Sequence, residues 1–329
     1  RNHMRPFASA PGAAPGAAPG RAALLHRPAL TRRLLLSALA LWVPASAPSP
    51  ASANYLSGYT ACAPGSCVTD ALFNRLRNRY ILFRPGECTF EAADIVDSNP
   101  INKQTEERGL TSKGKEQVRR SAKALQARGI TSPVIFYDNG ARGTQTADII
   151  AGQIGVSRKD VEPEFRWLEA RGLGELEGNS LREALSFYAA ADKEDIDNRA
   201  APTDDGTPSD SVNDVFSRMR NTIAKIENSY SGSDFIIVGG DTTVLSVFAA
   251  VACKYELTDH AKFTLRPGEF YDLREIVQEV AAGTFKPMTL DTPTDADIAR
   301  GREYLREMGP RMFGETEAGS WVLGEGVRR

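Results

Sequence analysis

Residues 234–242 read DFIIVGGDT, and this stretch decides the fold of the chain. Four consecutive large apolar residues, Phe235 to Val238, end at a glycine pair, which is the pattern of a short strand buried on both faces. Residues 242–253 continue as a run rich in Val, Leu, Phe and Ala, which predicts a buried helix. A buried strand that opens directly into a helix indicates a parallel sheet.

The alternation of strands and helices extends from this segment in both directions. We expect strands at 79–84, 133–138 and 164–168, helices at 112–128, 142–154, 181–191 and 211–229, and a loop at 192–210. Segments 261–266 and 270–276, separated by a Pro-Gly-Glu turn, predict an antiparallel hairpin at the end of the sheet. These elements predict an α/β fold, a three-layer αβα sandwich around a mostly parallel sheet. The loops after its strands should converge on one pocket, where ligands bind in such sheets.

Composition limits the function further. With 329 residues and 41% hydrophobic content, the chain suits one α/β domain of about 200 residues with extensions. A net charge of -2 argues against a nucleic-acid partner. We expect no membrane span in the mature protein, because no apolar run reaches roughly 18 residues. We also expect no metal and no cofactor, since no CxxC pair or His/Cys cluster is present.

The N-terminal region has the composition of a targeting signal. The first acidic residue is Asp70, and the Arg-containing, Ala/Pro/Gly-rich sequence before it is typical of organelle transit peptides. Arg32 and Arg33 precede the apolar run 34–43, and a stretch ending in Ala-Ser-Ala at 51–53 completes a twin-arginine export signal. This tandem predicts the chloroplast thylakoid lumen, with residues 1–53 removed. A plain bacterial periplasmic or secretory signal is the alternative.

Three further segments follow the signal. We expect a lead-in at 54–78, the folded domain at 79–280 and a C-terminal extension at 281–329 with a polar helix near 293–308. The lead-in holds Cys62 and Cys67 in a loop containing Pro and Gly. In an exported protein these two residues can form a disulfide, and two free thiols are the alternative.

Six short motifs follow one another across residues 79–276. They are RYILFRPGE at 79–87, GLTSKGKEQ at 109–117, YDNGARGTQTA at 137–147, LEARGLGELEG at 168–178, SVNDVFSR at 211–218 and IVGGDT at 237–242. In this order they resemble the histidine phosphatase superfamily, the phosphoglycerate-mutase-like proteins. Each motif alone is a weak signal, but six in the correct order are specific.

The resemblance implies phosphoryl transfer through a phosphohistidine. In this family one histidine is the nucleophile, two arginines and a second histidine hold the phosphoryl oxygens, and a carboxylic acid protonates the leaving group. By position, Arg84 and Arg142 match the anion-binding arginines and Glu169 matches the acid. Pro85 stands at the nucleophile's position and Gly239 at that of the second histidine. Neither side chain can accept a phosphoryl group.

Other groups offer weak substitutes for the missing imidazoles. His260 is the one histidine after the N-terminal signal, and we expect it to be an ordinary surface or strand-edge residue. Cys88 lacks the closely following arginine that cysteine phosphatases need, and Asp241 also occurs in relatives with an intact second histidine. Without a nucleophile, Glu169 is better interpreted as an ion-pair partner that holds the pocket together.

These observations favour a pseudophosphatase, that is, a non-catalytic binding or scaffold protein of the thylakoid lumen. A phosphate or phosphate-ester site at Arg84 and Arg142 is expected to remain, and a protein partner is expected to dock on residues 310–329. One alternative is an active phosphatase or mutase with a displaced nucleophile. Another, based on predicted location alone, is a subunit or assembly factor of a photosynthetic complex.

Overall fold

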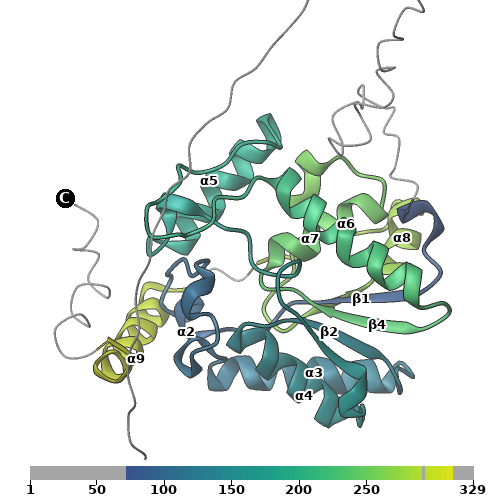
Figure 1. The fold of residues 1–329 in the computed structure, drawn as a ribbon, viewed down its shortest axis with the longest axis horizontal. Coiled ribbons are helices and arrows are strands. Elements are labelled where there is room, and N and C mark those ends of the chain that lie inside the picture. The colour runs from purple at the N-terminus through teal and green to yellow at the C-terminus, as the bar shows by residue number, and fades with distance from the viewer. Residues whose placement is uncertain (1–71, 291–292, 314–329) are drawn as a thin grey trace, which may run out of the picture. The chain divides into compact units, whose positions relative to one another are not determined.

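The computed structural model describes residues 72–290 and 293–313 (Figure 1). The targeting signals, Cys62 and Cys67 lie outside the described residues, as do residues 314–329, so the predictions made for them stay predictions.

Five strands form one sheet in the order β3-β2-β4-β1-β5. Their bounds are β1 (Arg79–Phe83), β2 (Val134–Asp138), β3 (Val161–Glu164), β4 (Asp234–Val238) and β5 (Phe270–Asp272). The first four run parallel, and β5 pairs antiparallel with β1 at the edge. Phe83 pairs with Val238, so β1 and β4 end at the same level and the loops that follow them lie together. The predicted α/β fold with a mostly parallel sheet is confirmed.

Helices cover both faces of the sheet (Figure 1). The α-helices are α2 (Thr89–Ala92), α3 (Ser112–Ala127), α4 (Ala141–Ile154), α5 (Leu181–Glu194), α6 (Val212–Ser229), α7 (Thr242–Ala252), α8 (Leu273–Ala281) and α9 (Asp295–Phe313). Short 3-10 helices are η1 (Phe73–Arg75), η2 (Pro100–Asn102), η3 (Glu106–Arg108), η4 (Arg158–Asp160), η5 (Gly174–Leu176) and η6 (Leu257–Phe263). Helices α3 and α4 lie on one face, and α6, α7 and α8 lie on the other.

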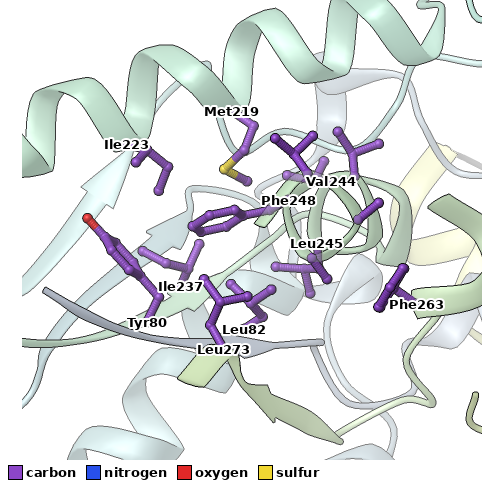
Figure 2. Packing of buried hydrophobic residues seen from close by; sticks show 14 of the residues in the cluster. Tyr80, Leu82, Met219, Ile223, Ile237, Val244, Leu245, Phe248, Phe263 and Leu273 are labelled. Atoms are coloured by element: carbon purple, nitrogen blue, oxygen red, sulfur yellow. The ribbon is translucent and has the colours of Figure 1, made fainter. Parts of the chain in front are cut away.

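Strand alternation divides the core into two apolar clusters. Along β1, Leu82 faces the cluster with α6 and α7, whereas Ile81 faces the cluster with α3 and α4. Figure 2 shows Phe248 of α7 between Met219 of α6 and Leu82, with Leu245 beside it. Because successive side chains of a strand point to opposite faces, a strand with four consecutive apolar residues must be covered on both sides. The continuous apolar runs therefore require three layers.

Two predicted strand assignments were wrong. The strand expected at 164–168 is β3, which ends at Glu164; Phe165, which follows it, is 64% exposed. The expected hairpin does not form either: residues 257–263 are the 3-10 helix η6, and β5 pairs with β1. Asp272 caps the helix that replaces the second hairpin strand, by accepting a hydrogen bond from the backbone N–H of Arg274. Apolar runs of this length fit either a strand or a helix, and only these contacts decide between them.

Candidate functional site

The loops after β1 and β4 meet at a pocket of about 70 Å³. Its lining includes Arg84 and Pro85 from the first loop, Gly240 and Asp241 from the second, and Arg142 from the first turn of α4. These residues are distant in the sequence and come together because β1, β2 and β4 are parallel neighbours whose C-terminal ends share one edge. The structure therefore brings these segments together at one pocket, as the sequence predicts.

Both terminal nitrogens of Arg84 donate hydrogen bonds to protein groups. One terminal nitrogen donates to the backbone carbonyl of Leu265, and the other donates to the carboxylate of Glu91, with which it forms an ion pair. The side chains of Arg84 and Glu91 are 12% and 22% exposed. The carboxylate of Glu91 thus pairs with the guanidinium that the sequence predicts to bind an anion.

Arg142 lies deeper in the pocket. Its Nη2 donates to the backbone carbonyl of Asp97 at 3.3 Å, and its Nη1 lies 3.9 Å from the sulfur of Cys88. Burial acts to lower the pKa of Arg142, but the negative charges that Cys88, Asp97, Asp138 and Asp241 carry when they are ionised outweigh it and raise the pKa above its ordinary value. This cation keeps its proton and is surrounded by acidic groups.

Cys88 lines the same pocket and is buried. Burial raises the pKa of its thiol, and the positive charge of Arg142 opposes that shift only in part. The thiol therefore stays protonated at neutral pH, whereas a cysteine nucleophile needs a low pKa.

Glu169 lies outside this lining, in an adjoining pocket. Its carboxylate accepts a hydrogen bond of 2.5 Å from Lys103 Nζ, which also lies 3.8 Å from Asp138 Oδ1. Burial raises the pKa of Asp138, although Lys103 and Arg142 partly oppose it. The geometry fits the interpretation of Glu169 as an ion-pair partner.

The two glycines after β4, Gly239 and Gly240, differ in their surroundings. A Cβ on Gly239 would contact Leu245 at 3.0 Å, and Gly239 does not line the pocket. Gly240 does line it, and a Cβ there would lie 2.3 Å from the backbone nitrogen of Ala170. Backbone of the loop at 168–170 therefore fills the space next to Gly240 that a side chain would need. Sequence reasoning singled out Gly239, and its match to the second histidine's position stays a prediction; Gly240 lines the pocket.

His260 is not the surface residue that the sequence predicted. It is 6% exposed, in η6, and its Nδ1 lies 2.9 Å from the hydroxyl of Ser246 on α7. Its Nε2 lies 3.1 Å from Asp192, which also accepts two hydrogen bonds from Arg171. The expectation failed because a lone histidine in a sequence does not reveal a buried acidic partner 68 residues away.

This network links the end of α5 to α7. Burial opposes ionisation of Asp192, but the hydrogen bonds from His260 and Arg171 outweigh it and hold the pKa of Asp192 below its usual range. Helix α5 contributes Leu181 and Leu185 to the pocket wall. The network thus positions one wall of the pocket without reaching its lining.

Residues 72–290 and 293–313 contain neither a candidate metal site nor a helix that could span a membrane. Their His, Cys, Asp and Glu side chains form no group of three or more that could hold a metal ion. None of their helices combines the length and the apolar character needed to cross a membrane.

Several solved structures are similar to this chain at low sequence identity. A search of curated protein sequences gave no match. Among solved structures, mycobacterial hydrolase 1 has 17% identity and a TM-score of 0.47, and the match covers 58% of this chain and 88% of that one. Mycobacterial glucosyl-3-phosphoglycerate phosphatase in complex with inorganic phosphate has 19% identity and a TM-score of 0.42, over 55% and 82%. Phosphoserine phosphatase from Entamoeba histolytica, in complex with 3-phosphoglyceric acid, has 17% identity and a TM-score of 0.42, over 59% and 88%.

The family assignment depends on the sequence itself. The model of the histidine phosphatase superfamily (branch 1) matches residues 82–279, which is more than half of the chain. This range holds five of the six quoted motifs completely, and the first motif begins three residues before it. The chain therefore belongs to branch 1 of the histidine phosphatase superfamily.

Proposed function

We propose that this chain is a non-catalytic member of its family, a pseudophosphatase that acts by binding. The observation that carries the proposal is the pocket lining, in which Pro85 and Gly240 stand beside Arg84 and Arg142 and none of the described lining residues is a histidine. A phosphohistidine mechanism needs an imidazole in line with phosphorus. His260, the one histidine among the described residues, is bound to Ser246 and Asp192 instead.

The other candidate nucleophiles are also occupied or unreactive. The thiol of Cys88 is buried and protonated, as its raised pKa indicates. Asp241 caps α7, because its Oδ1 accepts from the backbone N–H of Val244 at 3.1 Å. Its Oδ2 accepts from the backbone N–H of Arg171 at 3.1 Å. A carboxylate that holds two backbone donors is a structural group, and attack on phosphorus through either oxygen would compete with one of these bonds.

The predicted targeting signal supports a cellular location for this function. We propose delivery to the thylakoid lumen, removal of residues 1–53 and a scaffold role there, with a protein of a photosynthetic complex as the partner. Import into isolated chloroplasts tests the location: the processed protein should begin near Asn54 and resist protease added outside the thylakoids. A product that remains in the stroma or is not imported would refute the location and leave the pocket argument untouched.

Hydrolysis of a generic aryl phosphate by the purified chain tests the absence of catalysis. We expect no turnover above that of the Arg142→Ala variant. Turnover that survives both Arg142→Ala and Glu169→Ala would come from a contaminating phosphatase. Turnover that Arg142→Ala abolishes, or a labelled phosphoenzyme, would establish the active phosphatase or mutase with a displaced nucleophile and end the non-catalytic proposal.

A further inference from the structure

Helix α2 is one turn long, and its residues contact both the pocket and the C-terminal helix. Glu91 faces the pocket and pairs with Arg84. Ala92 and Ala93 touch α9 on the other side, and Figure 1 shows α9 beside α2. The contact of α9 with Ala92 is thus one residue along the chain from Glu91, which pairs with Arg84 in the pocket.

Glu91 takes the place that an incoming oxyanion would need. The guanidinium of Arg84 donates to Leu265 at one end and to Glu91 at the other, with little of either ionic side chain exposed. A second anion at this point would lie against the carboxylate and be repelled. Phosphate can therefore bind Arg84 only where Glu91 is displaced or loses its charge.

The contact between α9 and α2 is close and specific. A Cβ on Gly301 would lie 2.2 Å from the backbone oxygen of Ala92, so only glycine lets the two backbones approach this far. Arg302 Nε donates to the backbone oxygen of Ala93 at 3.1 Å, which caps the C-terminal end of α2. Ile298 and Leu305 are buried, at 6% and 2% exposure.

The same helix is nevertheless held apart from the main core. Neither of the two large apolar clusters around the sheet includes a residue of α9. Its described side chains away from the contact are mostly charged or exposed. Since few apolar side chains secure it, α9 can leave α2 without unfolding the sheet.

We propose that Glu91 is an internal carboxylate that closes the anion site on Arg84, and that α9 holds it there by clamping α2. Release of α9 then frees Arg84, together with Arg142, for an oxyanion such as phosphate or a phosphate ester. This is a regulation of the pocket and rests on the proposed non-catalytic function. In this proposal α9, which lies in the C-terminal extension, regulates the pocket and is not needed for the core fold.

Calorimetric titration of the full-length chain with inorganic orthophosphate tests the proposal. Glu91→Gln removes the charge and keeps the size of the side chain, and we expect phosphate affinity to rise about tenfold or more. The control Glu116→Gln removes the same charge from an exposed pair on α3 and should leave affinity unchanged.

Two glycines in helices form a matched pair for the role of α9. Gly301→Gln places a side chain against Ala92 and should raise phosphate affinity, with faster tryptic cleavage after Arg302 as the sign of release. Gly152→Gln, on α4, meets no atom within 4 Å at its Cβ and should change neither readout. Arg302→Gln removes the hydrogen bond to Ala93 and is a milder release that keeps the test decisive if Gly301→Gln fails to fold. Because this variant also lacks the tryptic site at 302, its readout is phosphate affinity alone.

The outcomes separate this inference from the proposed function. Unchanged affinity in Glu91→Gln overturns the closure of the site, and a gain in Glu91→Gln without one in released α9 variants overturns the clamp. Combining Glu91→Gln with Gly301→Gln should add nothing beyond Glu91→Gln, because both open the same contact, and an additive gain would contradict the mechanism. Aryl phosphate turnover by the unaltered chain would refute the non-catalytic function alone, since the titration measures binding.

Discussion

The backbone N–H of Gly268 donates a hydrogen bond of 2.9 Å to the carbonyl oxygen of Pro85. This bond joins two copies of the same tetrapeptide, Arg-Pro-Gly-Glu, at 84–87 and 266–269. A second bond of 2.9 Å, from the N–H of Arg84 to the carbonyl of Glu269, completes the pairing. The turn before β5 therefore supports the loop that opens the pocket, where Pro85 has no N–H of its own to donate.

Replacing Gly268 by alanine should disturb this pairing. Gly268 has φ of +73°, and a Cβ there would lie 2.5 Å from Cβ of Gln117, whose side chain accepts from the backbone N–H of Glu87. We expect Gly268→Ala to lower the free energy of unfolding by about 3 kcal/mol, as the sum of a left-handed backbone and a clash. Gly129→Ala is the control, since its φ of +79° is similar but no atom lies within 4 Å, and it should cost about 1 kcal/mol. Equal losses in urea unfolding would show that packing against Gln117 contributes nothing.

Gly240 offers a second test of close backbone packing. Its added Cβ would lie 2.3 Å from the nitrogen of Ala170, so Gly240→Ala must push two backbone segments apart. We expect a loss of about 2 kcal/mol or more in urea unfolding. Gly152→Ala, in open space on α4, should instead stabilise the chain by about 1 kcal/mol, because alanine favours the helix. A neutral Gly240→Ala variant would mean that the loop at 168–170 gives way easily.

Restoring imidazoles should not restore catalysis. In the variant Pro85→His with Gly239→His, the Cβ of the second side chain lies 3.0 Å from Leu245, and Arg84 remains paired with Glu91. We expect aryl phosphate hydrolysis to stay at background. The same result is expected with Gly240→His, whose side chain starts against the backbone of Ala170. Phosphatase activity in either double variant would show that the pocket is preformed for phosphoryl transfer.

The sequence was sufficient for the layers of this fold because the decisive runs are apolar on every residue. In strand 234–238 the four residues after Asp234 are apolar and buried on alternating faces, so only a sheet covered on both sides can bury them. It was insufficient for segment 270–276, where β5 is only three residues long and Asp272 starts a helix. Short apolar segments carry no period that separates helix from strand, and long-range pairing with β1 decides.

The site shows the same division. Its family motifs gave Arg84 and Arg142, which the structure brings to one pocket. Nothing in the sequence indicates that Glu91 reaches back to Arg84, because an acidic residue on a one-turn helix is ordinary. The buried partners of His260 come from α5 and α7 and are equally invisible, since a contact across 68 positions leaves no local pattern.

The buried carboxylate of Asp192 should matter more than its surface counterparts. Asp192→Asn breaks a pair with Arg171 whose side chains are only 3% and 2% exposed, and we expect a loss of about 3 kcal/mol in urea unfolding at pH 7. Asp148→Asn removes an exposed pair with Arg158 and should cost no more than about 0.5 kcal/mol. Similar losses for the two variants would contradict the positioning role of the network.

The pH dependence of this difference has a definite sign. The pKa of Asp192 is lowered in the folded chain, so its ionised form contributes stability above the unfolded pKa of about 4. That contribution is lost as pH falls through the folded pKa. The gap between the wild-type chain and Asp192→Asn should therefore narrow below about pH 4. A gap that widens in acid would reverse the assigned shift.

At alkaline pH, a second ionisable group, the thiol of Cys253, should make the stability of the folded chain depend on pH. Burial raises its pKa from 9.0 to about 12, so between these values the unfolded chain loses a proton that the folded chain keeps. Stability must then fall as pH rises, by at most about 1.4 kcal/mol per pH unit from this group. Urea unfolding of the wild-type chain and of Cys253→Ala at pH 8 and pH 10 measures it. The alanine variant, which has no thiol to ionise, should lose less stability between the two pH values, and equal losses would assign the alkaline effect to other groups, such as the tyrosines.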